Sequence, residues 1–286
     1  MRTPSPSYEI VGAIVKQRLG IDLGAYQAHK VQRELEHVAR EESLDDVAQL
    51  LARLTSRNSE RLATRVAVAL TNNETSFFRD GHPFDALRTR VLPQLLEARR
   101  DRRALTIVSA ATSTGQEAYS IAMTVLEAFP ELATWDLEIV GFDVDEAALE
   151  RARAGVYSKL EIQRGVPSWK VSRFFAQEGD QYRARPSLRA RVRFERMNLI
   201  EHWPLSRPVD VLFLRNVLIY FTADTRARVL KRAARHLAPD GFLFAGSSER
   251  VDDGGLFEVA TDVEAPCYRR RGVERPGRIA PTSRDS

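Results

Sequence analysis

Residues 105–117 combine a short apolar run, a loop of small side chains and a carboxylate, which is typical of a ligand-binding turn. The run 105–108 (LTIV) is too short for a helix and suits a buried strand. Small residues fill 109–115, and a helical pattern of apolar residues follows Gly115. A strand, a tight loop and a helix start bring backbone N–H groups close to a ligand, so we expect a nucleotide-type site here.

The loop carries neither of the glycine signatures that bind phosphates. It has no GxxxxGK[ST], whose lysine and backbone hold phosphates, and no GxGxxG, which lets the chain approach a pyrophosphate. Glu117 instead stands where such sites need bare amides. This carboxylate disfavours a polyphosphate and favours a cationic ligand. S-adenosylmethionine, with its sulfonium, ammonium and adenosine, fits that description.

The next predicted strand, over 135–140, leads to a second carboxylate. Asp143 follows this strand and lies 28 residues beyond Gly115. In nucleoside-binding α/β folds, an acidic residue at this place accepts hydrogen bonds from the ribose hydroxyls. Asp145 has the character of an N-cap for a helix over 146–154. We therefore assign the ribose to Asp143 and a structural role to Asp145.

The polar segment 71–80 (TNNETSFFRD) has two possible roles. It is either a helix-capping loop plugged by its two phenylalanines, or a segment folded over the ligand. In the second case Asn73, Thr75 and Arg79 make polar contacts while the phenylalanines exclude water.

Apolar periodicity divides the chain into two parts. It is helical almost throughout from residue 8 to about residue 70, which predicts a small all-helical domain over 1–75. Strand and helix patterns then alternate over 76–272, as in an α/β domain. The strongest buried-strand signal starts at Val209 and ends at Arg215 and Asn216. A turn at 239–241, another strand and a closing hairpin follow.

Residues 155–195 interrupt this alternation, because glycines and prolines break them into short pieces. We expect a helix near 168–176 and short polar strands over 181–185 and 189–194. Together they predict a small antiparallel insertion at about 165–195. The tail, 273–286, has the composition of a disordered segment.

The second predicted helix carries a group of basic residues: His29, Lys30, Arg33, His37 and Arg40. They form either a solvated basic face or a docking face for an acidic helical partner, and the sequence leaves both open. The two histidines lack the i, i+4 spacing of helical metal ligands, and we expect no metal site.

Composition limits the remaining possibilities. The 286 residues include 43 basic and 39 acidic side chains, a net charge of +4 that is too small to indicate nucleic-acid binding. The single cysteine, Cys267, excludes an intramolecular disulfide and is expected to be buried. We find no signal peptide pattern and no run of 18 apolar residues, so we expect a cytoplasmic protein without membrane insertion.

Six segments taken together resemble the chemotaxis receptor methyltransferases, the CheR family. In chain order they are TNNETSFFRD, SAATSTGQEAYSIAM, GFDVDEAALERARAGVY, MNL, FLRNVLIYF and PDGFLFAGSSE, and the likeness spans about residues 8–270. It implies a helical domain packed on a Rossmann-like methyltransferase domain that carries a small antiparallel β-subdomain. It also implies methyl transfer from S-adenosylmethionine to glutamates on the cytoplasmic helices of chemoreceptors, with S-adenosylhomocysteine as product.

The resemblance further implies roles for individual residues. Cofactor contacts would come from Asn73, Thr75, Arg79, Glu117, Asp143, Asn198, Leu199, Arg215 and Asn216. Asn198 and Leu199 would flank the adenine, while Arg79 and Tyr220 would orient the incoming glutamate as the catalytic pair. A glutamate carboxylate is already ionised at neutral pH, so no general base is required.

The chain departs from the family pattern in two places. Gln116 and Ala118 replace the glutamate and proline that often flank the motif glutamate. The β-subdomain between Phe175 and Val192 is short and lacks the Gly-rich loop of members that dock on a receptor's C-terminal pentapeptide. This favours direct engagement of the methylation helices, and we expect a monomer.

Other functions fit the sequence less well. A methyltransferase for a nucleic-acid base or small molecule would usually carry [DN]PP[YF], whereas the strand end at 215–218 reads RNVL. A nicotinamide oxidoreductase would need the missing GxGxxG. The intact set Arg79, Glu117, Asp143 and Tyr220 argues against a chemotaxis adaptor that binds receptor and cofactor without transferring methyl.

Overall fold

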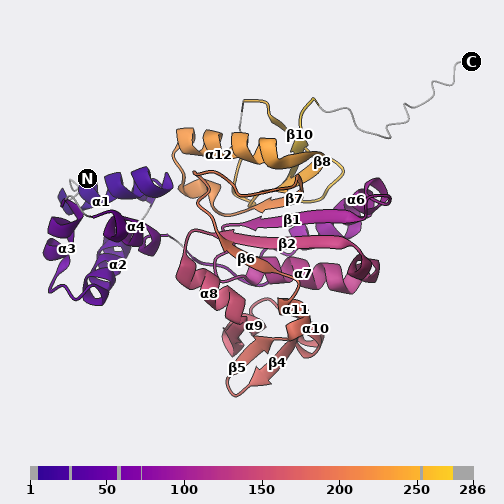
Figure 1. Cartoon of the computed structure of the whole chain (residues 1–286), viewed down its shortest axis with the longest axis horizontal. Helices are drawn as coiled ribbons and strands as arrows, with labels where there is room; N and C mark the ends of the chain where they lie inside the picture. The colour runs from indigo at the N-terminus through magenta and orange to yellow at the C-terminus, as the bar shows by residue number, and fades with distance from the viewer. Residues whose placement is uncertain (1–5, 26–27, 57–58, 72, 252–253, 273–286) are drawn as a thin grey trace, which may run out of the picture.

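The computed structural model describes residues 6–25, 28–56, 59–71, 73–251 and 254–272. Within these ranges a helical N-terminal part lies beside a central sheet, and a small antiparallel insertion extends below the sheet in Figure 1. The predicted tail over 273–286 lies outside the described residues.

In the part of the chain that the structure describes, four helices and a short 3-10 turn make up the helical domain, as predicted. They are α1 (Pro6–Leu19), η1 (Leu23–Ala25), α2 (Ala28–Glu41), α3 (Val47–Leu54) and α4 (Glu60–Ala69). Their apolar faces meet in one core that buries Val15, Leu35 and Val66. No described helix is long and apolar enough to cross a membrane.

The central sheet has the order β6-β2-β1-β7-β8-β10-β9 among the described residues, and it confirms the α/β class. The strands are β1 (Ala104–Ala110), β2 (Asp136–Asp143), β6 (Arg193–Arg196), β7 (Val209–Leu214), β8 (Leu237–Phe244), β9 (Phe257–Val259) and β10 (Cys267–Arg270). The neighbouring strands β6, β2, β1, β7 and β8 are parallel to one another. Strands β9 and β10 form the predicted antiparallel hairpin. Since the order reverses between β1 and β7, their carboxyl ends open onto a topological switch point.

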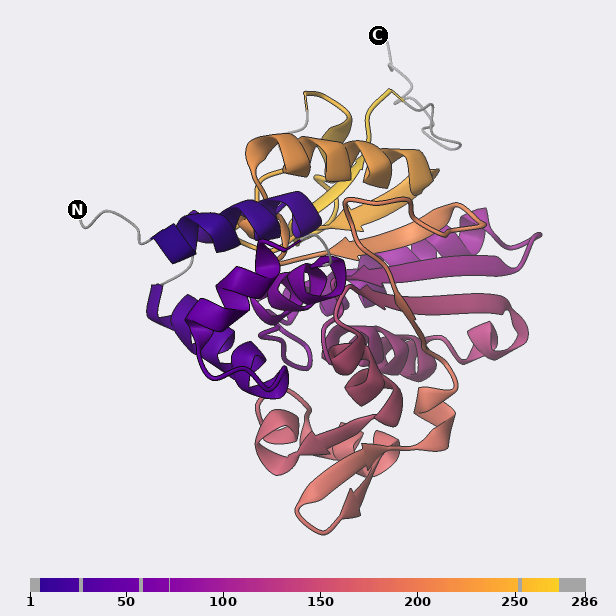
Figure 2. The ribbon, with the colours of Figure 1, turned by 60° about the vertical axis from the view of Figure 1, so that its left-hand side comes forward.

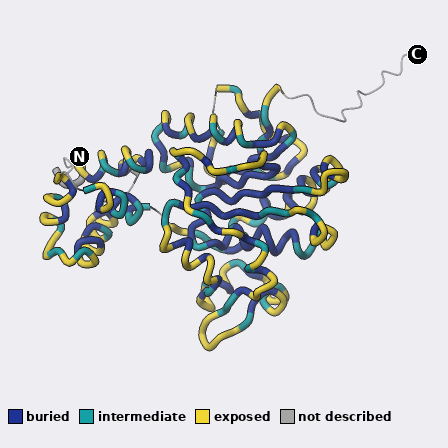
Figure 3. Tube along the Cα trace, in the orientation of Figure 1, coloured by how far each residue is buried: buried dark blue, intermediate teal, exposed yellow. Residues whose placement is uncertain are grey.

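Helices cover both faces of this sheet. They are α5 (His82–Ala86), the π-helical η2 (Leu87–Val91), α6 (Leu92–Ala98), α7 (Gln116–Ala128), η3 (Pro130–Thr134), α8 (Glu146–Ala154), η4 (Leu218–Tyr220) and α12 (Ala223–His236). Alternate residues of β1 serve the two layers: Ile107 joins the cluster that contains α7, and Val108 joins the cluster that contains α12. Figure 3 shows how completely the central strands are buried, and Cys267 of β10 is buried as expected.

The insertion differs from the prediction in its last strand. Its sheet is β3 (Val156–Ser158), β5 (Gln181–Ala184) and β4 (Phe175–Glu178), with α9 (Lys159–Gln163), α10 (Ser168–Phe174) and α11 (Pro186–Arg189) around it. The antiparallel sheet thus begins at residue 156, ahead of the expected 165. The predicted strand over 189–194 is wrong, because Phe194 belongs to β6 and pairs in parallel with Gly141 of β2.

Close packing explains that placement of β6. A Cβ atom at Gly141 would lie 2.7 Å from the Phe194 ring, so the ring occupies the space that a side chain would otherwise take. This contact joins residues far apart in sequence, and a local pattern cannot indicate it.

The predicted turn at 239–241 is also wrong. These residues lie inside β8, where the register with β7 shifts between the pairs Val209↔Leu237 and Val211↔Phe242. The irregularity is a bulge that presents Asp240 to Arg99.

A buried ionic network ties the amino-terminal parts of β1, β7 and β8 together. Arg99 donates from Nε to Asp210 Oδ1 at 2.9 Å and from Nη1 to Asp240 Oδ2 at 2.6 Å. Arg102 donates to Asp210 Oδ1 at 2.8 Å, and Asp210 Oδ2 accepts from the Thr106 N–H at 2.9 Å. Asp210 is fully buried, so its charge depends on these partners.

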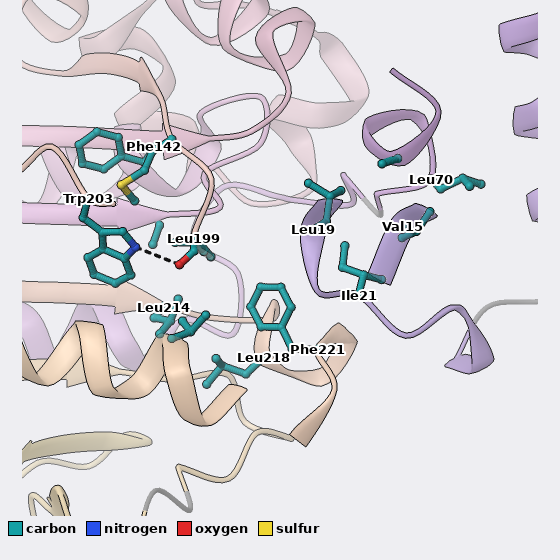
Figure 4. Packing of buried hydrophobic residues seen from close by; sticks show 14 of the residues in the cluster. Val15, Leu19, Ile21, Leu70, Phe142, Leu199, Trp203, Leu214, Leu218 and Phe221 are labelled. Atoms are coloured by element: carbon teal, nitrogen blue, oxygen red, sulfur yellow. Dashed lines mark hydrogen bonds between the residues drawn. The ribbon is translucent and has the colours of Figure 1, made fainter. Parts of the chain in front are cut away.

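The end of α1 is hydrogen-bonded to the segment that follows β7. The Asp22 N–H donates to the Tyr220 carbonyl at 2.8 Å, and the Thr222 N–H donates to the Gly20 carbonyl at 3.2 Å. Figure 2 shows α1 lying alongside the sheet domain. The apolar side of this contact, drawn in Figure 4, places Leu19 and Ile21 in one cluster with Phe221.

We expect Asp210→Asn to lower the free energy of unfolding by about 3 kcal/mol, because it leaves Arg99 and Arg102 short of a buried counter-charge. Urea denaturation followed by circular dichroism measures this change. The network lies at the amino-terminal ends of the strands, opposite the switch point, so ligand binding at low temperature should be unaffected. A loss below about 1 kcal/mol, the worth of an exposed pair, would contradict the importance of the network.

Candidate active site

A pocket opens at the carboxyl edge of the sheet, where the strand order reverses. It encloses about 880 Å³ with its open mouth included. The ends of β2, β6 and β7, the loop after β1, the segment after α4 and the end of α1 contribute to its walls. The structure brings all ten predicted site residues together around it: Asn73, Thr75, Arg79, Glu117, Asp143, Asn198, Leu199, Arg215, Asn216 and Tyr220.

The loop between β1 and α7 has an unusual backbone. Ala111 and Ser113 have positive φ values of 57° and 52°, a conformation that non-glycine residues adopt rarely and that often marks functional sites. Gly115 has φ 90°, and a Cβ atom there would lie 2.8 Å from Ala152 of α8. Glycine at 115 therefore allows α7 to start close against α8.

The Asp143 carboxylate holds this loop at the end of β2. Its Oδ2 accepts from the Ser113 N–H at 2.7 Å, and its Oδ1 accepts from the Asp145 N–H at 3.0 Å. Burial raises the pKa of Asp143 above its ordinary value. Asp145 accepts at 3.0 Å from the Ala147 N–H, which confirms that it caps α8.

Glu117 and Arg215 form a buried ion pair on the floor of the pocket. Arg215 donates from Nη1 to Glu117 Oε2 at 2.9 Å, and Ser109 Oγ donates to Glu117 Oε1 at 2.8 Å. The side chain of Arg215 is 1% exposed and that of Glu117 is 13% exposed. Burial raises the pKa of Glu117, and the nearby Arg215 charge opposes that shift.

Arg215 also anchors the segment that precedes α5. Its Nη2 donates to Asp80 Oδ2 at 2.7 Å and to the Arg79 carbonyl at 3.0 Å. Its buried Nε finds no hydrogen-bond partner among the described residues.

The segment 73–80 packs against the insertion and also lines the pocket. Phe77 is buried and makes edge-to-face contacts with Tyr157 and Phe175 of the insertion. A Cβ atom at Gly165 would lie 2.0 Å from the Phe77 carbonyl oxygen, so the insertion closes tightly on this segment. Thr75 and Arg79 line the pocket.

Two predicted contact residues are already engaged by protein groups. The Asn73 amide donates to Asp145 Oδ2 at 2.7 Å. The Asn198 amide donates to the Arg18 carbonyl at 3.0 Å, which links the end of β6 to α1. Each lines the pocket while bridging two elements, and Leu199 beside Asn198 adds an apolar wall.

The sequence argument missed several groups that shape the pocket. Leu19 and Ile21 line it from the helical domain, Ser113 contributes its backbone, and the buried Glu249 holds the loop after β7. The small-residue loop could have indicated Ser113. No local pattern indicates the others, because their roles depend on contacts between distant segments.

The lining suits S-adenosylmethionine. Asp143 and Glu117 supply carboxylates for hydroxyl and ammonium groups. Met197, Leu199 and Val144 form an apolar wall suited to a purine ring. No phosphate cradle is present among the described lining residues.

Comparison with known families gives the same cofactor. Residues 73–264 match the CheR methyltransferase SAM-binding domain, and residues 6–71 match the CheR methyltransferase all-alpha domain. Among solved structures, the CcbJ methyltransferase from Streptomyces caelestis is similar with 17% identity and a TM-score of 0.34, over 57% of this chain and 52% of that chain. That likeness is too distant to bear on function.

Several proteins named as chemotaxis methyltransferases are similar to this chain over most of its length. A chemotaxis protein methyltransferase 1 of Pseudomonas aeruginosa is 33% identical, over 88% of this chain and 93% of that protein. The chemotaxis protein methyltransferase of Vibrio anguillarum is 34% identical, over 85% and 89%. A probable chemotaxis protein methyltransferase of Rhizobium etli is 38% identical, over 70% and 75%. The chain therefore belongs to the CheR family of S-adenosylmethionine-dependent chemotaxis methyltransferases.

Proposed function

We propose that this methyltransferase esterifies the side-chain carboxylates of specific glutamates on the cytoplasmic helices of chemoreceptors. The observation that carries the proposal is the chemistry of the pocket wall. None of the described lining residues is a histidine or a cysteine, and each lining carboxylate has a partner: Asp143 and Glu117 accept hydrogen bonds, and Glu74 forms an ion pair with Arg164 at 3.6 Å. An acceptor that must first lose a proton would find no obvious base here, whereas a glutamate arrives ionised.

The reaction then needs no proton transfer. S-adenosylmethionine supplies an electrophilic methyl group on a sulfonium sulfur. A carboxylate oxygen of the acceptor forms the new bond to the methyl carbon while the carbon–sulfur bond breaks and its electrons pass to sulfur. The products are a neutral ester and S-adenosylhomocysteine, and the charges balance.

Under this proposal the protein contributes mainly orientation. Alignment of two reactants can lower a barrier by roughly 7–11 kcal/mol. Arg79 and Tyr220 line the pocket from opposite segments, before α5 and after β7, and we assign them to the incoming carboxylate. Arg215 is already paired with Glu117 and Asp80, so its charge is balanced and does not clamp the nucleophile.

We further propose that the protein acts as a monomer in the cytoplasm and engages the receptor helix directly, and the length of one hairpin supports the direct engagement. Strands β4 and β5 are joined by two residues, Gly179 and Asp180, so this hairpin has no long loop for a receptor tail. Esterification would remove negative charge from a helix bundle, a local change that can bias a two-state signalling element.

The acceptor chemistry is tested by transfer of radiolabelled methyl from S-adenosylmethionine to membranes that contain the organism's chemoreceptors. We expect label that mild base releases as volatile methanol, because a carboxyl methyl ester hydrolyses readily. Base-stable label would contradict ester formation and indicate nitrogen or carbon methylation. Cofactor binding without any transfer would favour a non-catalytic adaptor.

We expect Asp143→Ala to weaken S-adenosylmethionine binding tenfold or more, about 1.4 kcal/mol, because it removes the proposed acceptor for the ribose hydroxyls. Isothermal titration calorimetry measures this affinity. Asp136→Ala is the matched control, since it removes a carboxylate at the opposite end of β2, away from the pocket. Equal affinities of Asp143→Ala and wild type would refute the ribose assignment.

We expect Tyr220→Phe to slow methyl transfer while cofactor affinity is kept, because its hydroxyl is assigned to the acceptor carboxylate. Initial rates at saturating cofactor, together with calorimetry, separate the two effects. Tyr182→Phe in β5 is the control, since it removes a hydroxyl outside the pocket. Parallel losses of rate and affinity would sink the orienting role.

A further inference from the structure

Glu249 is a buried carboxylate whose described partners are all backbone N–H groups. It is 6% exposed and lies just beyond the end of β8. Its Oε2 accepts from the Asn216 N–H at 2.7 Å and from the Gly246 N–H at 2.6 Å. Its Oε1 accepts from the Leu218 N–H at 2.7 Å and from the Ile219 N–H at 3.4 Å.

This pattern is unusual because a buried carboxylate generally has a cationic partner. Among the described residues, the hydrogen bonds and ion pairs at the pocket assign the nearby arginine, Arg215, to Glu117 and Asp80. Glu249 instead accepts hydrogen bonds from backbone N–H groups that are not bonded within a strand or helix. One of them, the Gly246 N–H, belongs to the turn after β8 that carries Glu249 itself.

The loop that Glu249 holds leads directly to Tyr220. Asn216 has φ 59°, so the chain turns sharply as it leaves β7, and a 3-10 turn over Leu218–Tyr220 follows. The far end of the same loop is held by the segment after α1, through the hydrogen bond from the Asp22 N–H to the Tyr220 carbonyl. Glu249 therefore fixes the near end of a segment whose two ends both depend on tertiary contacts.

The space around the carboxylate is also closely filled. A Cβ atom at Gly246 would lie 2.7 Å from Glu249 Oε2 and 2.7 Å from the Asn216 amide nitrogen. The turn after β8 and the loop after β7 thus interlock, and a small displacement of one must move the other.

We infer that Glu249 is a positioning residue for methyl transfer: it holds the loop 216–220 so that Asn216 and Tyr220 face the pocket. This inference rests on the proposed function for the role of Tyr220. Glu249 does not line the pocket, so it acts through these residues and touches neither substrate.

The main test is Glu249→Gln. The substituted side chain keeps the size but has one acceptor oxygen, so two of the four N–H groups lose their partner in either amide orientation. We expect kcat to fall by about 100-fold, the effect of displacing an orienting group by about 1 Å. We also expect faster hydrogen exchange in the segment 215–221 and weaker cofactor affinity by about tenfold.

A double-mutant cycle separates positioning from loss of stability. If Glu249 acts through Tyr220, then adding Glu249→Gln to Tyr220→Phe should lower kcat little further, whereas independent effects would multiply. Asp210→Asn is the matched control, because it also neutralises a buried carboxylate but lies away from the pocket. It should lower stability without changing kcat at low temperature.

A milder variant keeps the test decisive if Glu249→Gln does not fold. Gly246→Ala retains the charge but crowds the carboxylate and the Asn216 amide, and it should lower kcat in the same direction. Wild-type kcat in either folded variant, or multiplicative losses in the cycle, would overturn the inference.

The proposed function can fail separately. If wild-type protein transfers no methyl to chemoreceptors, the proposed function is refuted. The positioning role of Glu249 is then tested by hydrogen exchange over 215–221 and by the cofactor affinity measured by calorimetry. Unchanged exchange over 215–221 and unchanged cofactor affinity in Glu249→Gln would overturn its positioning role, while the expected changes would support it.

Discussion

The guanidinium of Arg215 is the group on which the pocket depends. It is almost fully buried, and it joins the end of β7 to the start of α7 through Glu117 and to the segment before α5 through Asp80 and the Arg79 carbonyl. A buried cation is tolerated when anions and carbonyl oxygens surround it, and each partner is equally dependent on the cation. One side chain thereby sets the relative positions of the three segments that enclose the ligand.

The charges of the pocket follow from this arrangement. Two carboxylates, on Glu117 and Asp80, share one guanidinium, and Asp143 adds a third carboxylate at the end of β2. Arg79 adds a second cation and Glu74 a fourth carboxylate, so the pocket is acidic on balance, in keeping with a methyl donor that carries a sulfonium and an ammonium. The strained loop after β1 is held in place by the hydrogen bond from the Ser113 N–H to Asp143, so the same carboxylate shapes the loop and lines the pocket.

The helical domain is part of the site as well as a neighbour of it. Leu19 and Ile21 line the pocket, and the end of α1 is hydrogen-bonded to the loop that carries Tyr220. With Glu249 holding the other end of that loop, the segment 216–222 is supported from both sides by elements distant in sequence. Anything that shifts α1 would shift this loop, which gives the two domains a direct mechanical connection.

The sequence alone determined the helical domain and the strand–loop–helix core, because apolar periodicity is a local signal. Of the ten predicted residues that line the pocket, Asn198, Leu199 and Tyr220 were predicted only through the resemblance to the CheR family. Tertiary structure decided the rest. Phe194 joined the parallel sheet because its ring fills the space over Gly141, and residues 239–241 became a bulge beside Arg99. Glu249 gained its role from N–H groups about 30 residues earlier in the chain. Such contacts form when distant segments pack together, and no local pattern records them.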